Sequence, residues 1–592
     1  MTVNEKIAAL RSLMKEKGLS AYIIPSTDPH ISEYAPAHWL SRAWISGFTG
    51  SVATVVITMD EAGLWTDGRY FLQADEQLAG TEVKTFKLGL EDVPDFTKWI
   101  NDKFGTGDKV GFDGKVFSVV LAKKLVSTFK LKGIEIESKY DLISEIWEDR
   151  PGLPGEELFE VDVEFTGQSR VDKIGAIRDG LRGQNCDYTL LCSLDDVCWA
   201  FNIRGYDVPF NPVLISYALI SMDRAILYVD KRKLPSGLED KFKSENIEIR
   251  EYSEVEKNIK ELDANKNIYI DPSRSNYWLY KAIPEEMNVV VGINISTHLK
   301  AIKNEVELNG VRNAMRKDCL AMIDNWMWME EKINDGGITE LSVMEYLESC
   351  RAKQEHYYGL SFNTIAGMGE HGAIIHYGST EKTSINITDR TFFLLDSGAQ
   401  FYDGTTDITR TYHFGKPTEE EKEDYTQVLM GHIDLTLAKF PVGTRGSQLD
   451  VLARKYLWDD YKQYHHGTGH GVGCFMNVHE GPQSIRMDEN STTLKPGMIV
   501  SNEPGLYRAG KHGIRIENLI TVKKSKETEF APFLEFENLT LFPIETKAIK
   551  KELMSQVQID WLNDYHRIVF ETVSPMCNEK QLTFLKNKIK AI

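Results

Sequence analysis

The first part of the chain alternates charged amphipathic segments with short apolar runs. Residues 1–20, MTVNEKIAALRSLMKEKGLS, have the spacing of an amphipathic helix, and 21–24 and 52–57 are apolar runs of strand length. The stretch 63–71 predicts a strand, a turn and the start of a helix. This alternation predicts a mixed α/β domain over residues 1–155.

The same order of elements recurs further along the chain. The run at 188–192 resembles the first strand of the opening domain, and the run at 225–230 resembles its third strand, which also ends in an aspartate. The stretch RPGLPGE at 150–156 has the proline and glycine content of a linker. We infer an internal duplication, with a second domain over residues 156–303.

A third domain begins with a helical pattern over 305–322 and becomes strand-rich afterwards. A chain of 592 residues is too long for a single core, which agrees with several domains. The lysine-rich tail from about 548 to 592 again has helical spacing, and we interpret it as a packing or dimerisation extension. The fold class predicted is α/β (α+β), with the third domain over residues 304–592.

Composition narrows the class of protein. The hydrophobic content of 42% and charged content of 27% are ordinary for a globular protein. A net charge of −19 argues against a nucleic-acid binder, which usually has a basic face. The chain shows neither an export signal nor an apolar run near the roughly 20 residues that cross a bilayer. The seven scattered cysteines are interpreted as reduced thiols. We therefore expect a cytoplasmic protein that binds neither nucleic acid nor membrane.

Histidines and carboxylates gather in the third domain. Ten of the 14 histidines lie within residues 356–512. In the same region an apolar run ends in Asp396, and the next strand carries Asp407. Buried carboxylates on adjacent strands repel each other unless cations lie between them. Either residue would alternatively cap a turn, which is the interpretation that we adopt for Asp403 because a glycine follows it.

A glycine-rich segment supplies imidazole groups. HGTGHGVGCFMNVHEGP, at 466–482, carries His466, His470 and His479. Glycine allows the backbone and a ligand to approach closely. The segment lacks the Gly-Lys-Ser/Thr ending of a phosphate-binding loop, so we do not interpret it as one. Three histidines in such a loop favour a functional site.

Two more carboxylates follow this segment. An apolar run ends in Glu503 before a Pro-Gly turn. Because side chains two apart in a strand share a face, Arg515 and Glu517 are expected to point one way. Ile514 and Ile516 are expected to point the other way. A half-exposed strand with an Arg–Glu ion pair would explain this last pattern as well.

Taken together, these stretches supply four carboxylates and one imidazole, an oxygen-dominated set of metal ligands. Such a set suits two divalent cations, with manganese first and cobalt, iron or zinc as alternatives. Its members, in chain order, are Asp396, Asp407, His470, Glu503 and Glu517.

This order of residues resembles the ligand set of the pita-bread metallopeptidases. The stretches AIIHYG, LLDSGAQFYDGTTDITRTYHF, HHGTGHGVG, SNEPGLY and GIRIENL are similar to those of the three-domain aminopeptidase P (Xaa-Pro aminopeptidase) enzymes. DGRYFLQA at 67–74 and LDDVCWAFNIRG at 194–205 resemble the N-terminal domains of that family. The resemblance covers nearly the whole chain. It implies two creatinase-like domains followed by a pita-bread catalytic domain.

The resemblance also implies a role for each metal-binding side chain. Asp396 would bind one metal. Asp407 and Glu517 would bridge both metals. His470 and Glu503 would bind the other metal.

For the substrate, the resemblance implies further roles. His376 and His479 would contact the peptide around the scissile bond, and His466 would line the same pocket. Arg69 would reach the peptide from the N-terminal domain. His470 and Arg515 complete the predicted substrate-binding set.

The implied reaction removes the first residue of a peptide whose second residue is proline, through a hydroxide that bridges two divalent metals. Glu503 would move a proton towards the departing proline nitrogen. A homodimer is expected because dimers are common in similar enzymes. One local departure is His371, where many relatives have asparagine.

Other interpretations are a prolidase, which cleaves dipeptides, and a non-catalytic pita-bread module that binds peptides or histones. A creatinase-like hydrolase without metals is opposed by the five intact ligand positions.

Overall fold

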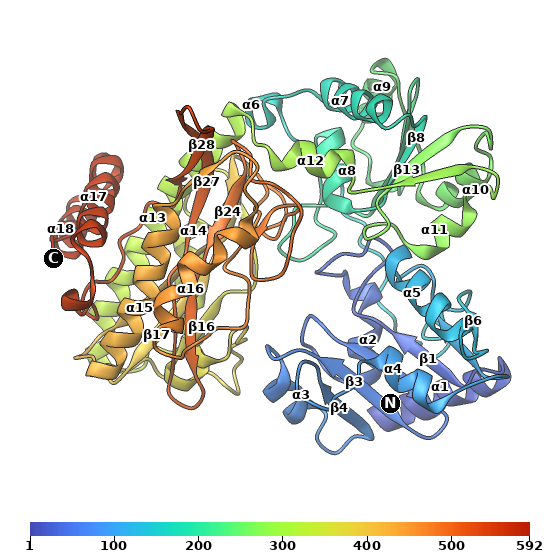
Figure 1. Ribbon diagram of the computed structural model, residues 1–592, viewed down its shortest axis with the longest axis horizontal. Helices are drawn as coiled ribbons and strands as arrows, with labels where there is room; N and C mark the ends of the chain where they lie inside the picture. Colours follow the sequence, from blue (N-terminus) through green and yellow to red (C-terminus); the bar gives the residue numbers. More distant parts are fainter. The chain divides into compact units, whose positions relative to one another are not determined.

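The computed structural model describes residues 1–592, and the statements below concern these residues without the side chains of Leu72 and Asn334. The chain divides into two compact units, and Figure 1 labels many of their helices and strands. The first unit comprises Met1–Glu160 and Gln168–Ser296, and the second comprises Val161–Gly167 and Thr297–Ile592. The domain boundaries predicted near residues 155 and 303 stay predictions.

The first unit begins with a six-stranded sheet. Its strands are β1 (Ala21–Ile24), β2 (Thr54–Thr58), β3 (Ala62–Thr66), β4 (Val83–Lys87), β5 (Lys109–Phe112) and β6 (Glu135–Glu137). They lie in the order β4-β3-β2-β1-β5-β6. The pairs β1–β2 and β2–β3 are antiparallel, and the other three pairs are parallel. The strand predicted at 21–24 is confirmed, and the one predicted at 52–57 starts two residues later.

A second sheet in this unit repeats the first. Its strands are β8 (Tyr188–Leu191), β10 (Ser216–Ser221), β11 (Ala225–Val229), β12 (Ile247–Glu251), β13 (Asn267–Ile270) and β14 (Asn288–Val291). The order β12-β11-β10-β8-β13-β14 has the same parallel and antiparallel pairs as the first sheet. The inferred duplication is therefore confirmed by topology. A short pair, β7 (Phe159–Glu160) and β9 (Ile203–Arg204), completes the strands of this unit.

The helices of the first unit are short. They are α1 (Val3–Glu16), α2 (Ser41–Ser46), α3 (Phe71–Gln77), α4 (Phe96–Lys103), α5 (Val119–Lys130), α7 (Arg170–Gly183), α8 (Leu194–Phe201), α9 (Leu238–Ser244), α10 (Val255–Lys260) and α11 (Tyr277–Ala282). The predicted N-terminal helix is confirmed as α1. It buries Ile7, Leu10 and Met14, which share one face, and a capping box of Thr2 and Glu5 fixes its start.

The second unit contains several small antiparallel sheets. Its strands are β15 (Tyr357–Leu360), β16 (Ile365–Met368), β17 (Phe392–Ser397), β18 (Ala399–Phe401), β19 (Gly404–Thr405), β20 (Ile408–His413), β21 (Lys439–Pro441), β22 (Gly469–His470), β23 (Ser484–Ile485), β24 (Ile499–Asn502), β25 (Gly505–Arg508), β26 (His512–Arg515), β27 (Asn518–Glu527) and β28 (Pro532–Asn538). The sheet orders that matter for the site are β16-β17-β20 and β21-β28-β27-β24, together with the pairs β22-β23 and β25-β26.

The helices of this unit range from four to 28 residues, and the longer ones lie beside its strands (Figure 1). The helices are α6 (Val163–Thr166), α12 (Ile295–Ala301, which begins in the first unit), α13 (Glu305–Lys332), α14 (Glu340–Arg351), α15 (Glu419–Thr436), α16 (Asp450–Trp458), α17 (Gln556–Val573) and α18 (Glu579–Lys588). Helix α13 begins at the predicted residue, capped by Asn304 and Glu307, and extends ten residues beyond the predicted 322. In the C-terminal extension, α17 packs against α15 and α18 packs against α13.

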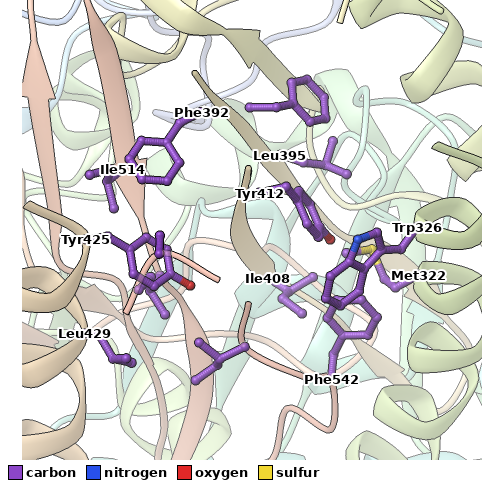
Figure 2. Packing of buried hydrophobic residues seen from close by; sticks show 14 of the residues in the cluster. Met322, Trp326, Phe392, Leu395, Ile408, Tyr412, Tyr425, Leu429, Ile514 and Phe542 are labelled. Carbon is purple, nitrogen blue, oxygen red and sulfur yellow. The ribbon is translucent and has the colours of Figure 1, made fainter. Parts of the chain in front are cut away.

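A large apolar core holds the second unit together (Figure 2). The ring centroid of Trp326, on α13, lies 5.0 Å from that of Tyr412 on β20 and 5.7 Å from that of Phe542. Burial of a large aromatic side chain stabilises a fold by about 2–3 kcal/mol, so this cluster fixes β20 firmly. Within the described chain, no helix combines the length and apolarity needed to span a membrane.

Candidate metal centre

Strand β20 has a core face and a polar face. Ile408 and Tyr412 belong to the core cluster. The other face carries Thr409 and Thr411, and Asp407 continues this alternation directly before the strand. The Thr409 hydroxyl donates to the carboxylate of Glu517, and the Thr411 hydroxyl donates to the carbonyl of Arg515. The apolar face therefore anchors the strand, and the polar face presents a carboxylate.

Asp396 is placed beside this polar face by strand pairing. In the antiparallel register of β17 and β20, Asp396 lies opposite Thr409. Asp396 is 7% exposed and Asp407 is 4% exposed. The sequence-based expectation that two adjacent strands bring these two buried carboxylates close together is therefore confirmed.

His470 approaches the carboxylates from the glycine-rich segment. Its Nε2 lies 3.5 Å from Asp407 Oδ2 and 3.5 Å from Glu503 Oε1. Gly469 is required here, because a Cβ at this position would lie 1.9 Å from the carbonyl oxygen of Ser501 on β24. Since the backbone N–H of Glu503 donates to the carbonyl of Thr468 at 2.8 Å, the two segments are held together.

Glu517 enters from the break between β26 and β27. A single strand was expected around Arg515 and Glu517, but the chain changes partners here: β26 pairs with β25, and β27 pairs with β24. Glu517 lies between them, and its N–H donates to the carbonyl of Thr409 at 3.1 Å. Its Oε2 accepts from the Thr409 hydroxyl at 2.8 Å.

The prediction that residues 514 and 516 point away from residues 515 and 517 is confirmed, whereas the alternative of an Arg515–Glu517 ion pair is wrong. Ile514 and Ile516 are fully buried in the core cluster. Arg515 and Glu517 turn towards Thr409, and Arg515 forms its ion pair with Asp396 through Nη2–Oδ2 at 2.5 Å. The alternative of a half-exposed strand is wrong, since Arg515 is 2% and Glu517 is 1% exposed.

The resulting cluster is compact and rich in negative charge. Ligand atoms of Asp407, His470 and Glu517 all lie within 4.8 Å of one another. Burial raises the pKa of Asp407, Glu503 and Glu517 well above the usual range, and repulsion from neighbouring carboxylates raises each further. A site of this kind needs positive charge to be ionised at neutral pH.

The donor set fits divalent cations. Asp396 Oδ1 is buried and accepts no hydrogen bond from any described residue, so this oxygen keeps a lone pair free for a cation. Four carboxylates and an imidazole are ligands that hard or borderline metals prefer. The assignment of each ligand to a particular metal stays a prediction.

Arg515 links the cluster to a tyrosine and a histidine. Its Nη1 donates to the hydroxyl of Tyr507 at 2.7 Å, and that hydroxyl lies 2.8 Å from His466 Nε2. Because a carbonyl only accepts, Nδ1 of His466 carries the ring hydrogen and donates to the carbonyl of Gly467 at 2.8 Å. In the neutral ring Nε2 is then an acceptor, so the Tyr507 hydroxyl donates to it. Burial, followed by the charge of Arg515, lowers the pKa of His466 to about 3.

The other predicted substrate-contacting histidines lie near the same cluster. The ring centroid of His479 is 4.4 Å from that of His470, edge to face. The charge of His376 contributes to the lowered pKa of His466, which places the two rings within electrostatic reach. Their contact with a substrate stays a prediction.

Two predictions lie outside the cluster. Arg69 belongs to the first unit, where it forms a two-point pair with Asp67 at 2.7 and 2.8 Å, and its role towards a substrate stays a prediction. Asp403 was expected to cap a turn. Instead its carboxylate is buried and accepts from Lys317 on α13 at 2.7 Å, because the helix supplies a cation at that point.

Thr409 and Tyr507 were not predicted as site residues. Thr409 accepts from Arg515 Nε at 3.2 Å and donates to Glu517, so it orients both side chains. Its position two residues after Asp407 was the available signal, because alternate residues of a strand share a face. Tyr507 had no comparable signal.

Buried clusters of carboxylates and histidine around paired cations are typical of dinuclear metallohydrolases. Comparison with known proteins agrees with this class. Residues 309–524 match metallopeptidase family M24, and 532–592 match the C-terminal region of peptidase M24. Residues 6–143 and 149–307 each match a creatinase/prolidase N-terminal domain.

The similarity to individual proteins covers nearly the whole chain. Xaa-Pro aminopeptidase 1 of Dictyostelium discoideum is 40% identical, over 100% of this chain and 97% of its own length. Aminopeptidase P2 of Arabidopsis thaliana is 40% identical, over 97% and 86%. The crystal structure of an X-prolyl aminopeptidase from Caenorhabditis elegans, described as a cytosolic enzyme with a di-nuclear active site, superposes with a TM-score of 0.96 at 37% identity, covering 100% of both chains.

The chain therefore belongs to metallopeptidase family M24, among the Xaa-Pro aminopeptidases. Its fold is that of two creatinase-type N-terminal domains followed by a pita-bread catalytic domain.

Proposed function

We propose that this chain hydrolyses the first peptide bond of peptides whose second residue is proline and releases the N-terminal amino acid. The observation that carries the proposal is the buried cluster in which ligand atoms of Asp407, His470 and Glu517 lie within 4.8 Å of one another. Relatives at 40% identity over almost the full chain carry the name Xaa-Pro aminopeptidase or aminopeptidase P.

Two divalent metals, with manganese first and cobalt, iron or zinc as alternatives, would be held by Asp396, Asp407, His470, Glu503 and Glu517. Bound divalent metals supply Lewis-acid polarisation of a carbonyl and lower the pKa of water. The chain itself supplies the orientation of the ligands. Thr409 holds Glu517, Arg515 holds Asp396, and the Thr468 carbonyl holds the backbone of Glu503.

The reaction also needs groups that contact the peptide. An Xaa–Pro bond has no N–H, and the proline ring fixes φ near −65°, so a site that grips an amide hydrogen fails on this bond. We assign contacts around the scissile bond to His376 and His479, with His466 and Arg515 in the same pocket and Arg69 reaching the peptide from the first unit. Glu503 would carry a proton towards the departing proline nitrogen.

Beyond the site, the proposal includes three domains with boundaries near residues 155 and 303, a homodimer and a cytoplasmic location. Duplicated sheet topology in the first unit supports the division of that unit into two domains. The similar C. elegans X-prolyl aminopeptidase is a cytosolic enzyme, which supports the location.

A peptide series tests the proposed function. Purified protein is incubated with Arg-Pro-Pro, Arg-Ala-Pro and the dipeptide Gly-Pro, with and without manganese, and the released first residue is measured. We expect turnover of Arg-Pro-Pro with metal and none of Arg-Ala-Pro. Turnover of Gly-Pro alone would make the chain a prolidase, and Asp396→Ala or His470→Ala should abolish any activity.

A further inference from the structure

A buried carboxylate outside the metal centre gathers an entire loop around itself. Glu340 is the first residue of α14, is 0% exposed and contacts none of the five candidate metal ligands through a hydrogen bond. The loop in question runs from the end of β16 to the start of β17, residues 369–391, and carries His376. The arrangement lies in the second unit, where Figure 1 labels α14, β16 and β17.

Glu340 accepts hydrogen bonds from two backbone positions, one directly before the loop and one in its second half. Its Oε1 accepts from the backbone N–H of Met368, the last residue of β16, at 2.8 Å. Its Oε2 accepts from the backbone N–H of Ile385 at 3.2 Å. One carboxylate therefore joins two backbone positions that are 17 residues apart in the chain.

The side chains on either side of His376 bond to the same carboxylate. The hydroxyl of Tyr377, the next residue, donates to Oε2 at 3.0 Å, and that of Ser379 donates at 3.3 Å. Nδ1 of His371 lies 2.9 Å from Oε1. Because an ionised carboxylate only accepts, His371 donates through Nδ1, and its ring stacks on Tyr377 with centroids 4.4 Å apart.

The backbone of α14 extends this anchorage. The N–H of Glu340 donates to the carbonyl of Ile385 at 3.1 Å, and the N–H of Leu341 donates to the hydroxyl of Ser384 at 3.2 Å. A carboxylate at the first turn is further favoured by the partial positive charge of the helix N-terminus. The loop is thus attached to the rigid end of a helix.

The anchorage is also tied to the metal centre through the sheet. Met368, which donates to Glu340, belongs to β16, and Ile365 on that strand pairs with Asp396 on β17. A displacement of the loop therefore moves His376 relative to a strand that carries a candidate metal ligand. The ligand itself stays in place, because β17 is also paired with β20.

We propose that Glu340 is a positioning residue, which sets the place of His376 relative to the metal centre and so controls turnover without taking part in metal binding. This inference rests on the proposed function. The proposed function and the role of Glu340 can be tested separately. A wild-type protein without Xaa-Pro activity would refute the function. An active wild type together with an equally active Glu340 variant would refute only the role of Glu340.

The test is a double-mutant cycle between Glu340→Gln and His376→Ala, measured as kcat on Arg-Pro-Pro with manganese. A glutamine keeps the shape but has one oxygen in place of two acceptors, so several donors lose their partner. A misplacement of about 1 Å costs on the order of 100-fold in rate, so we expect Glu340→Gln to lower kcat by about 10- to 100-fold. In the His376→Ala background, Glu340→Gln should have little further effect on kcat, because the side chain that Glu340 positions is already absent.

A matched control distinguishes positioning from loss of stability. Glu421, on α15, is also a buried carboxylate. It accepts from Thr418 at the start of its helix and from Thr391, where the loop meets β17 and 15 residues after His376, so it bonds to none of the side chains beside His376. Glu421→Gln should lower stability without changing kcat, and both variants should retain the metal content of the wild type. The proposal would be overturned if Glu340→Gln left kcat unchanged or lost bound metal. It would also be overturned if Glu340→Gln lowered kcat equally in the wild-type and the His376→Ala backgrounds.

Milder variants keep the test valid if Glu340→Gln does not fold. Tyr377→Phe and Ser379→Ala each remove a single donor to the carboxylate. Each should lower kcat by a few-fold, because each removes only one of several hydrogen bonds to the carboxylate. The effect should vanish in the His376→Ala background, and its persistence there would contradict the role of Glu340.

Discussion

Substitution of Glu517 by glutamine should stabilise the metal-free protein although it removes a predicted metal ligand. Glu517 is 1% exposed, and its ligand atom lies within 4.8 Å of those of Asp407 and His470. Two negative charges at 4.8 Å repel by about 3 kcal/mol at an effective dielectric constant of 20. Burial raises the pKa of Glu517, and the charges of Glu503 and Asp396 raise it further, so the fold disfavours the ionised carboxylate when no cation is present.

The net gain is smaller than the repulsion itself. Glutamine still accepts from the Thr409 hydroxyl, but the neutral hydrogen bond is weaker than the charge-assisted one by about 1 kcal/mol. Partial protonation of the wild-type cluster already relieves part of the repulsion. We therefore expect the metal-free variant to be about 1–2 kcal/mol more stable than the metal-free wild type.

Addition of metal should reverse this order. A ligand at 100 times its Kd stabilises the folded state by about 2.7 kcal/mol, and the wild type should gain this while the variant gains little. The assay is urea unfolding followed by fluorescence, in EDTA and in manganese. Glu421→Gln serves as the control, and should be destabilised equally in both conditions. A Glu517→Gln protein that is less stable than the wild type in EDTA, or equally stabilised by manganese, would refute this reasoning.

Two further predictions concern single side chains. Thr409→Val removes the hydroxyl that bonds to both Arg515 and Glu517, so each of these charged groups loses a hydrogen-bond partner. We expect the unfolding free energy to fall by about 1–3 kcal/mol and kcat to fall as well. An unaltered kcat would argue against a role for Thr409 in orienting Glu517. His566, on α17, has its pKa lowered to about 4 by burial, so the unfolded state binds the proton more tightly and stability falls as pH drops from about 6.5 towards 4. Between pH 7 and 5 this group should account for about 2 kcal/mol of lost stability, and His566→Gln should show a correspondingly smaller pH dependence; equal slopes for the two proteins would contradict this assignment.

The sequence predicted those parts of the fold that depend on local patterns. The strand at 21–24 and the start of α13 at Glu305 were placed correctly, because apolar runs and a capping residue are visible in the sequence. The internal duplication was also visible. The strand order within each sheet was not, since pairing between distant strands is set by tertiary packing.

In the candidate metal centre, too, some features were predictable from the sequence and others were not. Asp396 and Asp407 were expected on adjacent strands, and the register of β17 and β20 brings them together. The alternative interpretation, an ion pair of Arg515 with Glu517 on a half-exposed strand, is wrong: Arg515 pairs with Asp396 at the point where the chain changes strand partners after β26. Tyr507 was missed because its bonds to Arg515 and His466 depend on that same local geometry.

The hydrogen bonds around Glu340 show a third limit of sequence reasoning. A glutamate at the start of a helix is common, and its spacing from the loop residues has no period. His371 was noticed only as a departure from similar sequences. Only the fold shows that its ring donates to the carboxylate that also binds Tyr377.

The most direct test of the central claim is the number of manganese ions bound per chain, measured by equilibrium dialysis and elemental analysis after removal of metal with a chelator. We predict two ions per wild-type chain and loss of tight binding in Asp407→Asn, with wild-type binding retained in Glu421→Gln. Fewer than two ions in the wild type, or an undiminished number in Asp407→Asn, would contradict the account.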